Sequence, residues 1–184
     1  MRWMALFADL EAQLEAAERG ELEAEVADRS RREAALVPAA DRVAAAVGAH
    51  VGVSVMGAGT VSGQLLDTGP DWLLLEDTGR RELLVPWSAV LSVTGLGART
   101  REPGAGGEVG ARLDLRWALR GLARSRAGLS VVLRDGTVHA GTLDRVGADH
   151  VELAVHPAGE PRRVGAVRGV VLLPLGALAV LRQA

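Results

Sequence analysis

The sequence predicts an α+β protein that is mostly β: two small five-stranded barrels in tandem, each preceded by a helix, behind an extra acidic helix at the N-terminus. An internal repeat is the first observation behind this prediction, because Gly63-Gln64-Leu65 recurs 78 positions later as Gly141-Thr142-Leu143. Leu84-Val85-Pro86 recurs in the same way as Leu172-Leu173-Pro174. The second observation is a change of hydrophobic period, from helical spacing in the first part of the chain to alternation from Val51 onward.

Four parts follow from these patterns. We expect an N-terminal amphipathic acidic helix over residues 1–37, a first barrel with its leading helix over 38–97, a Gly- and Pro-rich linker over 98–111, and a second barrel with a basic leading helix over 112–184.

The N-terminal segment is predicted to be helical over residues 2–36, since Ala, Leu, Glu and Arg dominate it. Its large apolar residues are three or four positions apart and so share one face; they are Trp3, Leu6, Phe7, Leu10 and Leu14. Gly20 marks a weak point, at which a bend or an end is expected. A second, short helix is predicted after Pro38, stopping at Gly48.

Strand patterns begin at Val51, where Val51, Val53 and Val55 alternate with small residues. Further strand-like segments cover residues 61–66, 72–75, 82–85 and 90–93, with turn residues between them. Five short strands joined by tight turns indicate a small barrel. In the second half a strand is expected over 129–133, followed by a hairpin turn at Asp135-Gly136.

Composition narrows the class of protein. The chain has no Cys, which excludes disulfides and thiolate metal sites and fits a reducing compartment. No apolar run reaches the length of about 18 residues expected of a membrane-spanning helix, and no secretory signal is evident, so we expect a cytoplasmic protein without membrane contact. Lys, Asn, Ile and Tyr, which have AT-rich codons, are all absent, as is typical of a high-GC bacterium.

The charge is unevenly distributed. Although the formal net charge is −2, residues 99–127 carry seven Arg against three acidic residues. A helix is predicted from about Arg112 to Ser125, with arginines recurring at every fourth position along one face. The candidate nucleic-acid-binding residues are Arg112, Arg116, Arg120, Arg124 and Arg126. Such a row can bind phosphates without base specificity; the alternatives are a solvated helix face, or weak ion pairs within the chain with the Glu-rich N-terminal helix.

The pattern resembles the Sm-like family, including its bacterial Hfq branch. The resemblance rests on three motifs. Gly-x-Leu recurs in the second strand of each repeat, and Val138-His139-Ala140-Gly141-Thr142-Leu143 is similar to the first Sm signature. Ala89-Val90-Leu91-Ser92-Val93 resembles the second signature. The resemblance implies small barrels whose strands pair between neighbouring units. Generic SH3-like or PRC-type barrels are an alternative at this level of similarity.

The RNA-reading residues of the Sm-like family do not carry over to this chain. Gly69 and Gly147 stand where that family has an Asp, and the base-contacting Asn has no counterpart because the chain has no Asn. The pair that precedes the second signature in Hfq is replaced by Trp87-Ser88, and by Leu175-Gly176 in the second copy.

No reactive constellation emerges from the remaining residues. His139, His150, Asp144 and Asp149 match no metal-binding spacing, so no metal ligand or cofactor is predicted. Thr60 and Ser62 have no His at a meaningful spacing, so no catalytic residue is predicted either.

Two aromatic and two acidic residues are assigned structural roles. We expect Trp72 to fill a barrel core and Trp87 to occupy an apolar position, the alternative for both being a stacking platform for bases. Asp71 and Asp149 are expected to cap the turns that precede the next strand.

Three functional hypotheses remain. The first is a non-catalytic interaction or scaffold protein that binds a protein partner or itself, with the apolar face of Trp3, Leu6, Phe7, Leu10 and Leu14 either packed within the chain or offered to a partner. The second is RNA binding through the basic helix. The third is an enzyme of unknown class, which rests only on scattered His and Asp residues. No small-molecule substrate is inferred.

Overall fold

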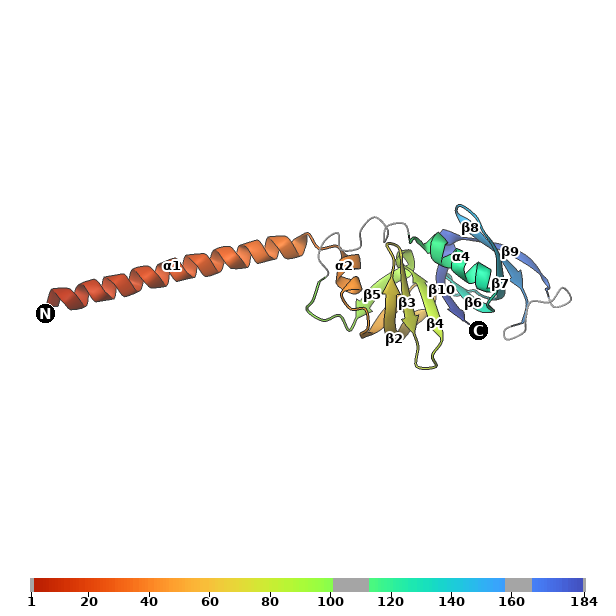
Figure 1. The fold of residues 1–184 in the computed structure, drawn as a ribbon, viewed down its shortest axis with the longest axis horizontal. Helices are drawn as coiled ribbons and strands as arrows, with labels where there is room; N and C mark the ends of the chain where they lie inside the picture. The colour runs from red at the N-terminus through yellow and green to blue at the C-terminus, as the bar shows by residue number, and fades with distance from the viewer. Residues whose placement is uncertain (1, 101–112, 158–166, 184) are drawn as a thin grey trace. The chain divides into compact units, whose positions relative to one another are not determined.

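The structure is a computed structural model that describes residues 2–100, 113–157 and 167–183 (Figure 1). Residues 1–38 and 39–184 form two compact units. The predicted linker over 98–111 lies almost entirely outside the described residues.

The first unit is one long helix, α1 (Arg2–Ala35), which confirms the predicted N-terminal helix. The expectation of a bend or an end at Gly20 is wrong, because α1 is continuous through this residue. Surface ion pairs four residues apart support the second half of the helix, between Arg29 and Glu33 and between Arg32 and Asp28. Each such pair adds a few tenths of a kcal/mol, roughly 0.2–0.5, to helix stability.

The described residues of the second unit form two helices longer than one turn and ten strands. Its first half consists of α2 (Ala39–Ala44), β1 (His50–Val55), β2 (Gly59–Thr68), β3 (Trp72–Glu76), β4 (Glu82–Pro86), the short 3₁₀ helix η1 (Trp87–Ala89) and β5 (Val90–Thr94). Its second half consists of α4 (Leu115–Ser125), β6 (Leu129–Leu133), β7 (Val138–Val146), β8 (His150–Val155), β9 (Gly169–Pro174), η2 (Leu175–Ala177) and β10 (Leu178–Gln183).

All ten strands belong to one antiparallel sheet, in the order β5-β1-β2-β3-β4-β10-β6-β7-β8-β9. The prediction of an α+β protein dominated by strands is therefore confirmed. The strands were expected in two separate barrels, whereas the hydrogen-bonded ladder passes from one group of five into the other through β4 and β10. Among the described residues no pairing joins β5 to β9, so the sheet is open.

The order of strands within each group of five is the same. In the first group the last strand, β5, lies beside β1, and in the second group the last strand, β10, lies beside β6. Gly63 and Gly141 occupy corresponding points on β2 and β7. A Cβ at Gly63 would overlap the carbonyl oxygen of Glu76, and a Cβ at Gly141 would overlap that of Ala154. Glycine is therefore required at both points by close approach of the next strand.

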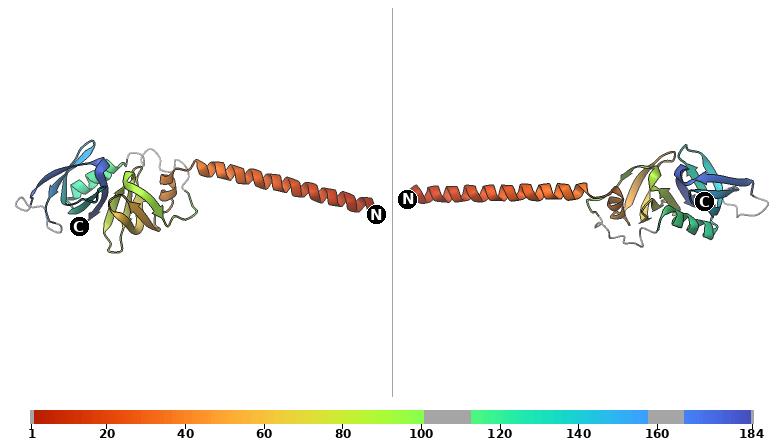
Figure 2. Two further views of the ribbon diagram at one scale, coloured as in Figure 1. Left: turned by 180° about the vertical axis from the view of Figure 1, so that it is seen from behind. Right: turned by 90° about the horizontal axis from the view of Figure 1, so that it is seen from above.

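Two apolar clusters fill the second unit. The first is built on β1–β5 and includes Val53, Leu65 and Leu75, and the second is built on α4 and β6–β10 and includes Leu119, Leu143 and Leu153. α4 lies against β7, as Figures 1 and 2 show. Among the described residues no helix is both long enough and apolar enough to cross a membrane.

Candidate interaction site

The two groups of strands meet at a seam, which we define as the β4–β10 pair. Leu84 lies opposite Leu181, and Leu83 lies opposite Arg182. Leu84 is only 4% exposed and belongs to the second apolar cluster, although it comes from the first group of strands. Ala179 and Val180 of β10 belong in turn to the first cluster. Each side of the seam therefore completes the core of the other.

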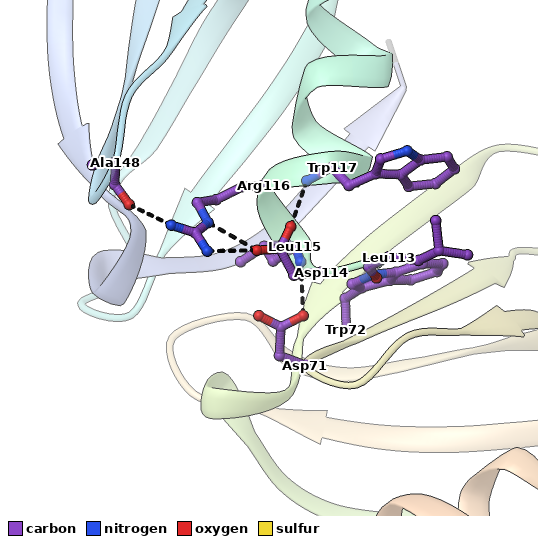
Figure 3. A network of polar contacts seen from close by, with 8 residues as sticks. All are labelled: Asp71, Trp72, Leu113, Asp114, Leu115, Arg116, Trp117 and Ala148. Atoms are coloured by element: carbon purple, nitrogen blue, oxygen red, sulfur yellow. Dashed lines mark hydrogen bonds and ion pairs between the residues drawn. The ribbon is translucent and has the colours of Figure 1, made fainter. Parts of the chain in front are cut away.

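A polar network fixes the start of α4 beside the seam (Figure 3). Asp114 is the N-cap of α4, where its carboxylate accepts a hydrogen bond of 2.9 Å from the Trp117 N–H. The Leu115 N–H donates to the Asp71 carboxylate at 2.7 Å. The Trp72 indole Nε1 donates to the Leu113 carbonyl at 2.7 Å. Asp71 of the first half thus accepts from an otherwise unsatisfied N–H at the start of α4, and Trp72 binds the carbonyl of the residue before the N-cap.

The carboxylates in this network differ in proton affinity. Loss of solvent around its carboxyl, aided by the nearby charge of Asp114, raises the pKa of Asp71, although the Leu115 N–H acts in the opposite direction. Burial also acts to raise the pKa of Asp114, but the Trp117 N–H and the Arg116 guanidinium outweigh it and hold that pKa below its usual value. Asp114 is therefore the firmly ionised member of the pair.

The sheet ends on both sides in an open edge. β5 pairs with β1 alone and β9 pairs with β8 alone, so each has one side without a strand partner among the described residues. Both edges carry exposed apolar side chains: Leu91 on β5 is 61% exposed and Leu172 on β9 is 57% exposed. Open edges with apolar side chains are sites where a further strand can add.

A groove of about 420 Å³ runs along the β5 edge, between this strand and α2. Its lining is mainly apolar, with Val43 from α2 and Trp87, Val90 and Val93 from the η1–β5 segment. Arg42 borders it and donates hydrogen bonds to the carbonyl groups of Gly97, Ala98 and Arg99, which ties the chain after β5 to α2. The groove combines an open backbone edge with a hollow that suits an apolar side chain.

The arginines of the predicted basic row have different surroundings. Arg112 lies outside the described residues. Arg116 is held by Asp114 at 2.7 Å, and Arg126 lies 3.6 Å from Asp144, so both are partly neutralised. Arg120 and Arg124 are exposed on α4. Among the described residues these two form no ion pair, although the charge of Arg120 helps to lower the pKa of Asp114.

The apolar side chains predicted to share one face of α1 are exposed within the helical unit. The side chains of Trp3, Phe7, Leu10 and Leu14 are all more than half exposed, while the side chain of Leu6 lies outside the described residues. That this face binds a partner stays a prediction.

The Trp, Asp and His residues discussed in the sequence analysis lie in the core, in the polar network or on separate strands. Trp72 is buried, as expected, but it lies in the second cluster although β3 belongs to the first group of strands, and Trp87 packs against the first cluster. The expected turn-capping role of Asp71 is wrong, because its carboxylate accepts from Leu115, 44 positions further along the chain. His139 and His150 lie on different strands, β7 and β8. In the described ranges no three His, Asp or Glu residues gather as metal ligands would.

Sequence reasoning missed three features. Trp117 is 47% exposed on α4, on the side away from Leu115 and Leu119, and helical spacing from those two residues could have found it. His156 is buried with Thr142, whose hydroxyl lies 2.8 Å from its Nε2, and no sequence motif marks this pair. The exposure of Leu91 and Leu172 depends on which strands are left at the edges, which the sequence does not reveal.

Comparisons with known proteins assign no family to this geometry. No protein-family model matches the chain, and no curated protein matches it.

Proposed function

We propose that this protein is a non-catalytic interaction scaffold, built from two Sm-like barrels in tandem, that binds another polypeptide along the open edges of its sheet. The Sm-like assignment is supported by the shared order of strands in the two groups and by Gly63 and Gly141, which stand where the next strand approaches most closely. It is also supported by the recurrence of a 3₁₀ helix before the last strand of each group, η1 before β5 and η2 before β10.

The main observation behind the proposed binding function is that the sheet has two open edges. At the seam, β4 and β10 pair with each other and bury their apolar side chains. β9 and β5 are the corresponding strands of the opposite groups, and both have an open side that exposes Leu172 and Leu91. Folded proteins normally protect such edges with charges, prolines or bulges, so exposed leucines there favour a binding role.

Site-specific photocrosslinking in cells tests this function. We expect a photoreactive amino acid at Leu91 or at Leu172 to form a covalent adduct with another polypeptide chain. The matched control is the same amino acid at Val138, which is also an exposed strand residue but lies on β7, in the interior of the sheet. Absence of any adduct at both edge positions contradicts the proposed function.

A second candidate function, binding of single-stranded RNA, is favoured by one observation. On α4 the exposed Trp117 shares a face with Arg120 and Arg124, three and seven positions further along. An indole that stacks on a base, beside guanidinium groups that bind phosphates, is a common arrangement for single-stranded nucleic acid.

Fluorescence anisotropy with a labelled oligouridine at low salt tests the second candidate. Trp117→Ala is expected to weaken binding by about 1–3 kcal/mol, the usual contribution of one stacked base. Replacing Arg120 and Arg124 by Ala should lower the salt dependence of the affinity by about one unit for each arginine. No complex at low salt would exclude this function.

A further inference from the structure

We infer that α1 carries a second interaction surface, through which two copies of this chain pair in antiparallel orientation along the N-terminal part of the helix. The surface consists of Trp3, Phe7, Leu10 and Leu14, which we call the α1 apolar face. This inference concerns the first unit alone and does not depend on the sheet edges of the second.

The α1 apolar face has the spacing of a coiled-coil seam. Its members are separated by four, three and four positions, so they recur about every 3.5 residues. Their exposed fractions lie between 51% for Leu10 and 72% for Trp3, and α1 is the only helix or strand that the structure describes in its unit. Four large apolar side chains on one side of such a helix remain in water unless a partner covers them.

The charges beside this face argue against lipid or nucleic acid as its partner. Residues 3–18 contain no basic residue, whereas they contain four acidic ones, which are Asp9, Glu11, Glu15 and Glu18. A helix that binds a membrane surface or phosphates carries basic side chains around its apolar ones, because both of these partners are anionic. An acidic helix with an apolar seam instead fits another helix.

The same seam becomes acidic further along α1, which limits how two copies can pair. The next positions of the repeat are Ala17, Glu21, Ala24 and Asp28. In a parallel pair each residue of the seam meets the same residue of the second copy. Glu21 and Asp28 would then each bring two carboxylates together inside the contact, where like charges repel and lose their water.

One antiparallel register avoids these contacts and still covers the whole α1 apolar face. It places Trp3 level with Leu14 of the second copy and Phe7 level with Leu10 of the second copy, and the reverse contacts complete four layers. Glu21 lies seven positions past Leu14, about 10 Å beyond the last layer. A register with a longer overlap would set Glu21 or Asp28 against a residue of the seam in the second copy.

The face is also complementary to itself in this register. Each aromatic side chain meets a leucine, so no layer holds two aromatic rings and none holds two leucines. Beside the layers, Glu11 falls next to Met4 of the second copy and not next to another acidic residue. Because residue i meets residue j and residue j meets residue i, the contact is two-fold symmetric and closes at a dimer.

Sedimentation velocity with the full chain tests whether the α1 apolar face holds the dimer together. We expect the native protein to dimerise and Leu10→Asp, which buries a charge in a central layer, to raise the dissociation constant roughly 30-fold or more. The matched control is Leu22→Asp, the same substitution at a leucine of α1 that is 61% exposed and outside the seam. It should dimerise like the native chain, and circular dichroism checks that both variants keep the helix.

Disulfide trapping tests the antiparallel register, and the absence of native Cys makes each introduced thiol unique. In this register position 3 of one copy lies level with position 14 of the other, whereas the two copies of position 3 are eleven residues apart along the helix axis, about 16 Å. A disulfide needs Cα atoms within about 7 Å. Under mild oxidation, an equal mixture of Trp3→Cys and Leu14→Cys should therefore form the mixed disulfide, which mass spectrometry identifies.

Three results would overturn the inference. They are a native chain that stays monomeric at every concentration, a Leu10→Asp variant that associates as the native chain does, and disulfides that join each variant only to itself, as a parallel pair would form. None of them bears on the proposed binding at the sheet edges, because photocrosslinking at Leu91 and Leu172 tests that function separately.

Discussion

Asp71 and Asp149 occupy corresponding positions in the two halves, yet their carboxylates have different partners. Asp71 accepts the Leu115 N–H at the start of α4, and loss of solvent around its carboxyl raises its pKa. Asp149 is hydrogen-bonded to His150 Nδ1 at 2.8 Å, and this bond lowers its pKa. The carboxylate thus joins the two halves in one copy, whereas in the other it is hydrogen-bonded to the adjacent residue.

Substitution of Asp71 separates the effects of its hydrogen bond and its charge. We expect Asp71→Ala to lower the free energy of unfolding by about 1 kcal/mol, because the Leu115 N–H loses its acceptor at a helix N-terminus. Asp71→Asn keeps an acceptor oxygen, and it should be at least as stable as the native chain at neutral pH. Chemical denaturation of the three proteins at acidic and neutral pH measures both effects.

The pH dependence of this prediction follows from the direction of the pKa shift. Because the pKa of Asp71 is raised above its ordinary value of 3.8 in the folded state, the stabilisation linked to its proton is complete below that pH. It is lost as the pH rises through the folded-state pKa, so the advantage of Asp71→Asn should grow from acidic to neutral pH. Asp149→Ala is the matched control and should cost less than Asp71→Ala, since its carboxylate is largely exposed. An equal loss from both alanine variants would show that the contact with α4 contributes nothing.

At the level of elements, local patterns in the sequence account for most of the helices and strands that form. Alternating apolar residues predicted the strands, since the residues that line one face of a strand are two positions apart and need no knowledge of its neighbours. The Asp135-Gly136 turn was predicted for the same reason, and Gly136 has a φ of +87° there. Gly20 was misjudged, because a glycine costs a helix interior only about 1 kcal/mol and good helix formers surround it.

Contacts between distant elements could not be predicted in this way. The pairing of Leu84 with Leu181 joins strands almost a hundred residues apart, and the sequence of neither strand indicates which strand it pairs with. The role of Leu172 follows only after that pairing is known, because the repeat then shows which side chain is buried at the seam and exposed at the edge. The candidate site was therefore mostly invisible in the sequence, although the repeat that explains it was its clearest feature.

For the whole molecule, the seam determines how the second unit unfolds. β10 contributes Ala179 and Val180 to the first cluster and Leu178 and Leu181 to the second. Loss of either cluster therefore removes the support of a strand that the other cluster needs. Arg134 adds a polar link, since its guanidinium donates to the Ser88 carbonyl at 2.7 Å.

We therefore expect residues 39–184 to unfold as one cooperative unit. Leu65 and Leu143 are equivalent in the repeat and fully buried, one in each cluster. Leu65→Ala and Leu143→Ala should each lower the free energy of unfolding by about 2–5 kcal/mol, the usual cost of a cavity in a core. Hydrogen exchange followed by mass spectrometry should show faster exchange in both groups of strands for either variant, because global opening exposes both.

The matched control is Leu22→Ala on α1, whose exposed side chain contributes to neither cluster. If Leu65→Ala accelerates exchange only in β1–β5, and Leu143→Ala only in β6–β10, the seam does not couple the two cores.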